Sequence, residues 1–286
     1  MKILTPAKIN PLLYILGKRK DGLHELYMHM VPVGLYDIIK FSKNNNKQLN
    51  FKVKGSTYIG EKKENLVIRA IRLFEKITGE DVYLDIILEK NIPSGAGLGG
   101  GSGNAAGTLC ALNQIFRNVS KDGGFLSPSK IFEMALELGS DVPFFLNPSP
   151  SKIIGRGEKL IPLTDYPKFF VVIIKPSFSI STHEAYKKCQ IQNKLMFPIV
   201  KSLDDLKTHM FNQFEKSLFN QYSILSEMKS LLLKNGAFGA LVSGSGSAVF
   251  GAFREKKLQN QAYKNLECLQ IGKIFTCETL VDHYYF

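Results

Sequence analysis

A glycine-rich run at residues 93–104 is the part of this sequence best suited to binding a charged ligand. Its twelve residues contain six glycines and two serines. Because glycine has no Cβ, the backbone there can adopt positive φ angles and turn several N–H groups toward one point. Such a concave row of N–H groups, next to the start of a helix, binds anions. We therefore expect the run to hold the phosphate chain of a nucleotide.

Three kinds of glycine loop compete for this interpretation. A P-loop ends in Gly-Lys-Ser or Gly-Lys-Thr, whereas this run ends in Ser102-Gly103-Asn104. The dinucleotide fingerprint GxGxxG is present at Gly95, Gly97 and Gly100, but the strand before it alternates as an antiparallel strand does. A protein-kinase glycine loop joins two strands, and here a helical pattern follows the run. Each of the three therefore conflicts with some feature of the sequence.

The flanks of the run predict the elements that position it. Alternating apolar residues at 82–88 predict a strand before the run, and apolar residues on one helical face at 105–116 predict a helix after it. A helix is also predicted at 65–77, and another begins at Ser127-Pro128 and ends at Gly139. The other strands predicted in this half are 3–16, interrupted by an insertion at 6–10, then 31–41, and 49–53, which pairs nearby.

The second half of the chain mixes strands and helices without regular alternation. Asn147-Pro148-Ser149-Pro150 breaks the structure, so we divide the chain into a domain at 1–150, which carries the glycine run, and a domain at 151–286. We expect an α+β fold in two lobes. The segments assigned to the second domain are 152–163, a strand at 169–174, helices at 203–219 and 222–234, a strand–loop–strand unit at 238–253, a helix at 255–267 and a strand at 273–281.

Composition predicts a globular cytoplasmic protein. The 286 residues are 44% hydrophobic and 22% charged, which is enough apolar material for a core, and no stretch has the apolar length needed to cross a bilayer. The first residues lack the apolar centre of a signal peptide. The four cysteines form no CxxC pair and the five histidines show no ligand spacing, so we expect reduced thiols and no structural zinc.

The formal net charge of +12 suggests nucleic-acid binding as an alternative. Only six of the 37 basic residues are arginine, the preferred residue for bidentate phosphate contacts. Lysines gather instead in one polar segment, 40–63, which we interpret as a solvated hairpin. A positive field also attracts small polyanionic substrates.

Several segments together resemble one enzyme family. The run at 93–106 is similar to the phosphate loop of the galactokinase, homoserine kinase, mevalonate kinase and phosphomevalonate kinase (GHMP kinase) family, and its branch that phosphorylates a cytidyl-diphosphate alcohol matches along nearly the whole length. Three positions depart from that pattern: Gly103 replaces a frequent Ser, Leu23 replaces an aromatic residue before the His, and Gln213 replaces an Asp. The further segments that carry the resemblance are 6–10, 18–26, 64–67, 139–145, 155–158 and 243–247.

The resemblance implies a two-lobe GHMP-kinase-like fold with a ribosomal-protein-like N-terminal lobe and a ferredoxin-like C-terminal lobe. It implies transfer of the γ-phosphate of ATP to an alcohol, with Mg²⁺ as the metal and Ser102 as a candidate ligand. The substrate would be a small molecule, with no nucleic acid or membrane partner, and the enzyme a monomer or homodimer. The residues implied in ATP binding are Asn65, Pro93, Ser94, Gly95, Ala96, Gly97, Leu98, Gly99, Gly100, Gly101 and Ser102.

Two residues are implied in the chemistry. Asp141 follows a helix-ending glycine, where an Asp alone is usually a turn residue, but in the family an Asp in Gly-Ser-Asp-Val-Pro is the catalytic acid/base. Lys8 is implied as its partner, because a nearby ammonium favours the ionised carboxylate. Ser102 and Asn65 have alternative roles as helix N-caps.

The substrate would be bound by residues from both halves. By resemblance, His24 reads the edge of the base, Asn10 holds the alcohol end, and the loop of Ser243, Gly244 and Ser245 closes the site. Tyr186 is either a stacking platform for the base or a helix-face residue packed on the core. Two alternatives remain: another kinase of the family, of homoserine or mevalonate type, and a basic RNA-binding module.

Overall fold

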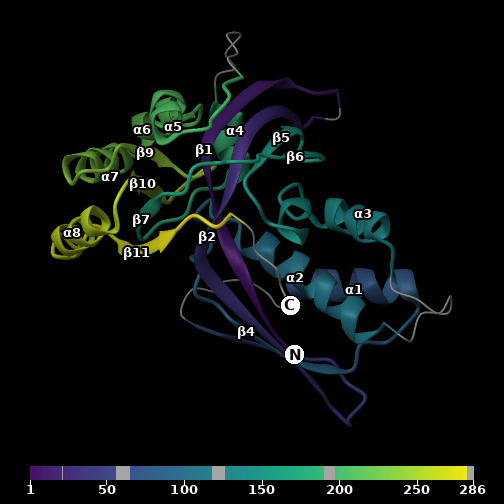
Figure 1. The fold of residues 1–286 in the computed structure, drawn as a ribbon. Helices are drawn as coiled ribbons and strands as arrows, with labels where there is room; N and C mark the ends of the chain where they lie inside the picture. The colour runs from purple at the N-terminus through teal and green to yellow at the C-terminus, as the bar shows by residue number, and fades with distance from the viewer. Residues whose placement is uncertain (21, 56–64, 118–125, 190–196, 282–286) are drawn as a thin grey trace.

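Two β-sheets with helices packed against them organise the chain in the computed structural model (Figure 1). The structure describes residues 1–20, 22–55, 65–117, 126–189 and 197–281. The strands are β1 Lys2–Lys18, β2 His24–Lys43, β3 Asn50–Lys54, β4 Leu84–Glu89, β5 Ser151–Gly155, β6 Lys159–Pro162, β7 Phe170–Lys175, β8 Phe211–Asn212, β9 Gly239–Val242, β10 Val249–Phe253 and β11 Lys273–Glu278. The helices are α1 Leu66–Thr78, α2 Gly100–Ile115, α3 Pro128–Leu138, the short 3₁₀ helix Pro143–Leu146, α4 Thr182–Lys188, α5 Leu203–His209, α6 Glu215–Gln221, α7 Ser223–Lys234 and α8 Lys256–Glu267.

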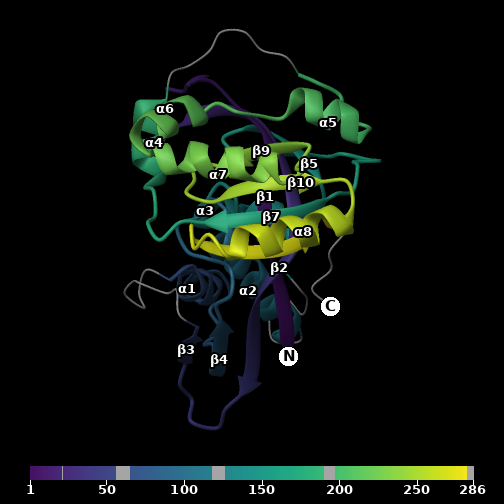
Figure 2. The same ribbon diagram turned by 90° about the vertical axis from the view of Figure 1, so that its left-hand side faces the viewer.

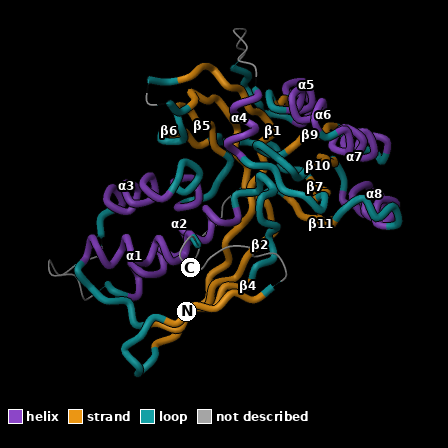
Figure 3. Tube along the Cα trace, turned by 180° about the vertical axis from the view of Figure 1, so that it is seen from behind, coloured by secondary structure: helices purple, strands orange, loops and turns teal. Residues whose placement is uncertain are grey.

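The first sheet is built on a long antiparallel ribbon. Strands β1 and β2 contain 17 and 20 residues and pair along nearly their whole length. The sheet has seven strands in the order β3-β4-β2-β1-β8, with β5 paired to β2 and β6 to β5. Helices α1, α2 and α3 lie together on one side of this ribbon, and helices α5 to α8 lie on the opposite side (Figure 3).

The second sheet is antiparallel and has the order β11-β7-β10-β9. Helices α7 and α8 pack against it and lie in front of it in Figure 2. An isolated bridge between Val33 and Thr279 ties this sheet to the middle of β2. The chain therefore has the mixed α and β architecture that its sequence predicts, with two sheets joined along one ribbon.

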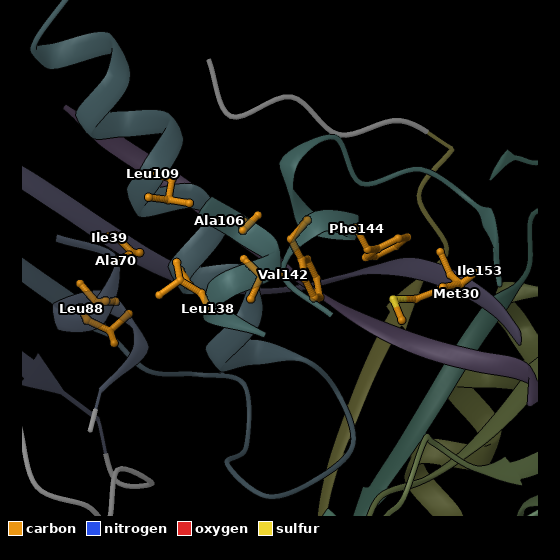
Figure 4. Packing of buried hydrophobic residues seen from close by; sticks show 14 of the residues in the cluster. Met30, Ile39, Ala70, Leu88, Ala106, Leu109, Leu138, Val142, Phe144 and Ile153 are labelled. Atoms are coloured by element: carbon orange, nitrogen blue, oxygen red, sulfur yellow. The ribbon is translucent and has the colours of Figure 1, made fainter. Parts of the chain in front are cut away.

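Helices α1 and α3 start where the sequence predicts. The Asn65 side chain accepts a hydrogen bond from the Val67 N–H at 2.9 Å, which caps α1, and Ser127 caps α3 by accepting from Lys130 N–H. Side chains from α1, α2, α3 and the first sheet meet in one core (Figure 4). Among them, Ala70 and Ala106 are fully buried, and their small side chains permit close helix packing.

Strand β1 is continuous, so the predicted insertion at residues 6–10 is wrong. Residues 6–9 pair with β2, with register shifts between Pro6 and Ala7 and between Ile9 and Leu12, and Asn10 lies within the second shift. Such irregularities bend a strand and change where its side chains point. Sequence alone cannot distinguish this from an inserted loop, since proline occurs both in loops and at strand irregularities.

The hairpin predicted at 40–63 is also wrong within the described residues. Strand β3 pairs parallel with β4 rather than with β2. A parallel pair needs a crossover connection, and α1 lies in this one between β3 and β4. Residues 56–63 of the predicted hairpin lie outside the described residues.

The single helix predicted at 203–219 is instead divided into α5 and α6 by β8. Residues Phe211 and Asn212 pair parallel with Leu12 and Leu13 of β1. The backbone groups at this edge of β1 would otherwise be buried without partners, and satisfying them outweighs local helix propensity.

The chain changes sheets after the predicted boundary at residue 150. Strands β5 and β6 follow that position and still belong to the first sheet, while the second sheet begins with β7. The division into 1–150 and 151–286 stays a prediction. Among the helices of the described ranges, none combines the length and apolarity needed to cross a membrane.

Candidate active site

One cavity of about 1080 Å³ collects the residues to which the sequence assigned chemistry. Its wall combines β1, the start of β2, the glycine run, the segment after α3, helix α4 and the loop between β9 and β10. The predicted residues in its lining are Lys8, Asn10, His24, Asn65, Pro93, Ser94, Gly95, Ala96, Gly97, Leu98, Gly99, Gly100, Gly101, Ser102, Asp141, Tyr186, Gly244 and Ser245. Ser243 is not in the lining, and its side chain is buried behind the loop.

The glycine run connects β4 to α2, as predicted, and leads its backbone into the first turn of that helix. Gly99 is the N-cap of α2 with φ 70°, and no side chain caps the helix. The first turn of α2 contains no acidic side chain either. Its N–H groups are therefore open to an anion, and the helix dipole adds positive potential at the same place.

Lys8 and Asp141 face each other in the cavity although 133 residues separate them in sequence. The Lys8 Nζ lies 3.7 Å from Asp141 Oδ2, and the two side chains are 5% and 34% exposed. The Lys8 side chain also runs against the helix start, because a Cβ built on Gly99 would lie 3.0 Å from Lys8 Cγ. The ion pair therefore lies beside the N-terminus of α2.

Asn10 holds the Lys8 ammonium in place. Lys8 Nζ donates to Asn10 Oδ1 at 2.6 Å, which is shorter than its distance to Asp141. The amide of Asn10 is fixed in turn, because Nδ2 donates to the His29 carbonyl at 3.3 Å. Burial lowers the pKa of Lys8 from its ordinary value, and the charge of Asp141 opposes that shift.

Local structure fixes the two charged residues. Lys8 N–H donates to the Leu98 carbonyl at 2.9 Å, which joins β1 to the glycine run. Helix α3 ends at Gly139 on the other side of the pair. The Val142 N–H donates to the Gly139 carbonyl at 3.1 Å, and this bond turns the chain at Asp141. The buried side chain of Phe145 anchors the 3₁₀ helix that follows.

His24 and Tyr186 form an aromatic pair in the cavity lining. Their rings stack with centroids 4.7 Å apart and an interplanar angle of 26°. Tyr186 also meets Phe214 edge-on at 4.9 Å. Burial raises the pKa of Tyr186 and, together with the charge of Lys18, lowers the pKa of His24. Tyr186 thus packs on the core and lines the cavity at once, and His24 covers one face of its ring.

The loop between β9 and β10 is fastened to the glycine run. The Ser243 hydroxyl donates to the Gly97 carbonyl at 3.0 Å, and Ala248 N–H donates to the Ala96 carbonyl at 3.1 Å. A Cβ on Gly97 would lie 1.9 Å from the Ser243 carbonyl oxygen, so only glycine fits there. Ser243 therefore joins two loops rather than facing the cavity, and Gly244 beside it approaches Lys8.

Sequence reasoning missed Asn212, whose side chain binds the backbone of this loop. Its Nδ2 donates to the carbonyls of Val242 and Gly244 at 2.7 and 2.8 Å. Its neighbour Gln213, the residue that replaces an Asp, accepts from Ile15 N–H at 2.8 Å and donates to the Ile15 carbonyl. The sequence did contain a signal for this contact. Asn212 and Gln213 stand together inside the segment predicted as a helix, and side-chain amides that become buried need specific hydrogen-bond partners.

The lining also determines how a metal could bind. Across the described ranges, no three His, Cys, Asp or Glu side chains converge on one point. Asp141 is the only carboxylate among the described residues of the lining, and Ser102 contributes a hydroxyl in the first turn of α2. This donor set suits a cation that takes most of its ligands from phosphate and water rather than from the protein.

Comparison with known proteins identifies relatives over nearly the full chain. Two family models match, GHMP kinases N terminal domain at residues 65–147 and GHMP kinases C terminal at residues 196–270. A 4-diphosphocytidyl-2-C-methyl-D-erythritol kinase of Syntrophus aciditrophicus is 38% identical over 92% of this chain and 93% of its own. The protein of that name from Syntrophotalea carbinolica is 36% identical over 98% of this chain and 99% of its own.

Solved structures agree with these sequence matches. A crystal structure of 4-(cytidine 5'-diphospho)-2C-methyl-D-erythritol kinase superposes with a TM-score of 0.83 at 31% identity, covering 98% of this chain and 99% of that one. A homoserine kinase from Cytophaga hutchinsonii superposes with a TM-score of 0.71 at 15% identity, covering 99% and 95% of the two chains. The second match shows a shared fold only.

Proposed function

Because this chain belongs to the 4-diphosphocytidyl-2-C-methyl-D-erythritol kinase family of the GHMP kinases, we propose that it transfers the γ-phosphate of ATP to the 2-hydroxyl of that cytidyl alcohol. The products are the 2-phosphate and ADP. The single observation that supports this chemistry best is the Lys8–Asp141 pair beside the open N-terminus of α2. A phosphoryl donor on the helix and an alcohol on the carboxylate would meet at that point.

In the proposed reaction, Asp141 orients the acceptor hydroxyl and takes its proton. The hydroxyl oxygen forms a bond to the γ-phosphorus, the bond from that phosphorus to the β-phosphate oxygen breaks, and ADP leaves. The N–H groups of the glycine run bind the β- and γ-phosphates, and the Lys8 ammonium offsets the negative charge that develops between donor and acceptor.

We propose Mg²⁺ as the cation that accompanies ATP. Ser102 would be its protein ligand, directly or through water, because its hydroxyl lies in the lining at the first turn of α2. The cation would neutralise phosphate charge. Asn65 would lie at the adenine end; it lines the cavity while capping α1.

We also propose the remaining substrate contacts from position in the cavity. The cytosine would lie at His24 and Tyr186, and the methylerythritol at Asn10 and the loop of Ser243, Gly244 and Ser245. Support comes from the cavity lining, which contains His24, Tyr186, Asn10, Gly244 and Ser245 together with Asp141, while Ser243 lies behind it in the same loop.

The lobes can be assigned in the same way. The second sheet has the strand order β11-β7-β10-β9, with helices between β7 and β9 and between β10 and β11, which supports a ferredoxin-like C-terminal lobe. We assign the first sheet to the ribosomal-protein-like lobe and keep the division at residue 150.

We further propose that the protein is a cytoplasmic monomer or homodimer that binds no nucleic acid. The four free thiols fit a reducing compartment.

One assay tests the main proposal. The purified protein is given Mg-ATP with the cytidyl alcohol, homoserine or mevalonate, and ADP release is followed. We expect turnover with the cytidyl alcohol only, and a product that carries phosphate on the 2-hydroxyl. Turnover with homoserine or mevalonate and none with the cytidyl alcohol would refute the proposal, as would salt-dependent RNA binding without ATP consumption.

A further inference from the structure

Three basic residues of the cavity have no role in the proposed phosphoryl transfer. Lys18, Arg156 and Lys187 all line the cavity, and none forms an ion pair with a described acidic residue. Each is exposed to solvent inside or at the rim of the cavity. Unpaired cations that share one cavity create a positive potential there and attract an anionic ligand.

The two sequence neighbours of Arg156 contact segments next to His24 and next to Asp141. Its turn joins β5 to β6, and Gly155 pairs with Leu26, two residues after His24. On the other side, Gly157 packs on the residue before Asp141, because a Cβ on Gly157 would lie 2.4 Å from the Ser140 carbonyl oxygen. Arg156 is thus flanked in sequence by one contact toward the base end and one toward the catalytic carboxylate.

The turn itself is fixed by a carboxylate that does not neutralise Arg156. Glu158 accepts a hydrogen bond from the Arg156 N–H at 2.6 Å, which closes the turn. The charge of Glu158 is compensated by Arg19, whose Nη1 lies 3.6 Å from it and 2.7 Å from Glu25. The guanidinium of Arg156 therefore remains available while its backbone is anchored.

The other two cations lie beside the base end. Lys18 pairs with His24 across the β1–β2 ribbon, and its charge contributes to the lowered pKa of His24. Lys187 follows Tyr186 in α4. Together with Arg156 they line the cavity that also contains His24, Tyr186 and Asp141.

We propose that Arg156 binds the diphosphate bridge of the substrate, with Lys18 and Lys187 completing a cationic site for it. The inference rests on the proposed function, which places a cytidine at His24 and an alcohol at Asp141. A guanidinium presents paired donors that match phosphate oxygens, so Arg156 would hold the bridge in two hydrogen bonds and fix the distance of the alcohol from Asp141. The site would select nucleoside diphosphates over monophosphates.

Binding of cytidine nucleotides tests this directly. Titration calorimetry compares CDP with CMP while a non-hydrolysable ATP analogue fills the glycine run. We expect wild type to bind CDP roughly tenfold to a hundredfold more tightly than CMP, the range of charge-assisted hydrogen bonds, and Arg156→Met to lose most of that ratio. Arg156→Lys should retain part of it, because the charge remains. Lys159→Met, which removes a nearby exposed charge outside the lining, should keep the full ratio.

Kinetics give an independent readout. Arg156→Met should raise KM for the cytidyl alcohol by a similar factor and leave KM for ATP unchanged, which a general loss of structure would not do. If wild type turns over the cytidyl alcohol but Arg156→Met keeps its KM and the CDP-to-CMP ratio, the diphosphate site is wrong. If wild type does not turn over the cytidyl alcohol at all, the proposed function itself fails.

Discussion

Substitution of Gly97 by alanine tests whether the contact between the glycine run and the loop of the second sheet is needed for catalysis. The new Cβ would lie 1.9 Å from the Ser243 carbonyl oxygen, so the loop must retreat by roughly 1.5 Å to reach ordinary van der Waals contact. Gly97 also has φ 74°, a conformation that costs other residues roughly 1–2 kcal/mol. The substitution is therefore strained in two independent ways.

The expected loss of stability follows from the bonds that this movement breaks. The Ser243 hydroxyl bond to the Gly97 carbonyl and the Ala248 N–H bond to the Ala96 carbonyl both join the two loops. Each is worth about 0.5–1.5 kcal/mol net. With the backbone strain, the free energy of unfolding should fall by roughly 2–5 kcal/mol. The rate should also fall, by about 10²-fold, because a 1 Å misplacement of reacting groups has that effect.

Urea unfolding and steady-state kinetics measure the two effects separately. Gly17→Ala is the matched control, because Gly17 has no positive φ and no atom within 4 Å of its added Cβ. The control should keep the wild-type unfolding midpoint and kcat. A Gly97→Ala protein with wild-type midpoint and kcat would show that neither stability nor catalysis depends on the contact between the two loops.

Three further outcomes follow from the described geometry. Asp141→Asn should lower kcat by roughly 10²-fold or more, because the proton acceptor is lost. ATP binding, measured by calorimetry, should stay near wild type because the N-terminus of α2 is unchanged, and a wild-type kcat would exclude Asp141 as the base. Asn10→Ala removes the oxygen that accepts a 2.6 Å hydrogen bond from the Lys8 ammonium, so Lys8 should lose its proton at lower pH. The alkaline limb of the plot of kcat against pH should therefore move to lower pH, and an unmoved limb would contradict this. Burial lowers the pKa of His29 to about 4, and its ring nitrogens have no described partner, so the native state should lose roughly 3 kcal/mol as pH falls from about 6.5 to about 4. The sign follows because the unfolded chain binds the proton more tightly; His29→Phe should show a smaller loss in urea unfolding across that range, and an equal loss would assign the effect to other groups.

The parts of this protein that the sequence determined by itself are governed by local chemistry. Asn65 and Ser127-Pro128 predicted helix starts because a capping side chain bonds to N–H groups only two or three residues ahead. The glycine run predicted a turn that leads into a helix start, because the ability to adopt positive φ is a property of the single residue. These features need no distant partner, so the order of residues is enough to read them.

Tertiary structure alone decided which distant segments meet. The sequence of β3 contains nothing that selects β4 over β2 as its pairing partner. The sequence of residues 203–219 likewise does not show that Phe211 and Asn212 form a strand that pairs with the edge of β1. The 3.7 Å between Lys8 and Asp141 and the bond from Ser243 to Gly97 likewise join segments more than 130 residues apart. Family resemblance could suggest that Lys8 and Asp141 act together. The distance between their charged atoms and the hydrogen bond from Lys8 to Asn10 depend on burial and on backbone groups that must find partners, which are properties of the packed chain.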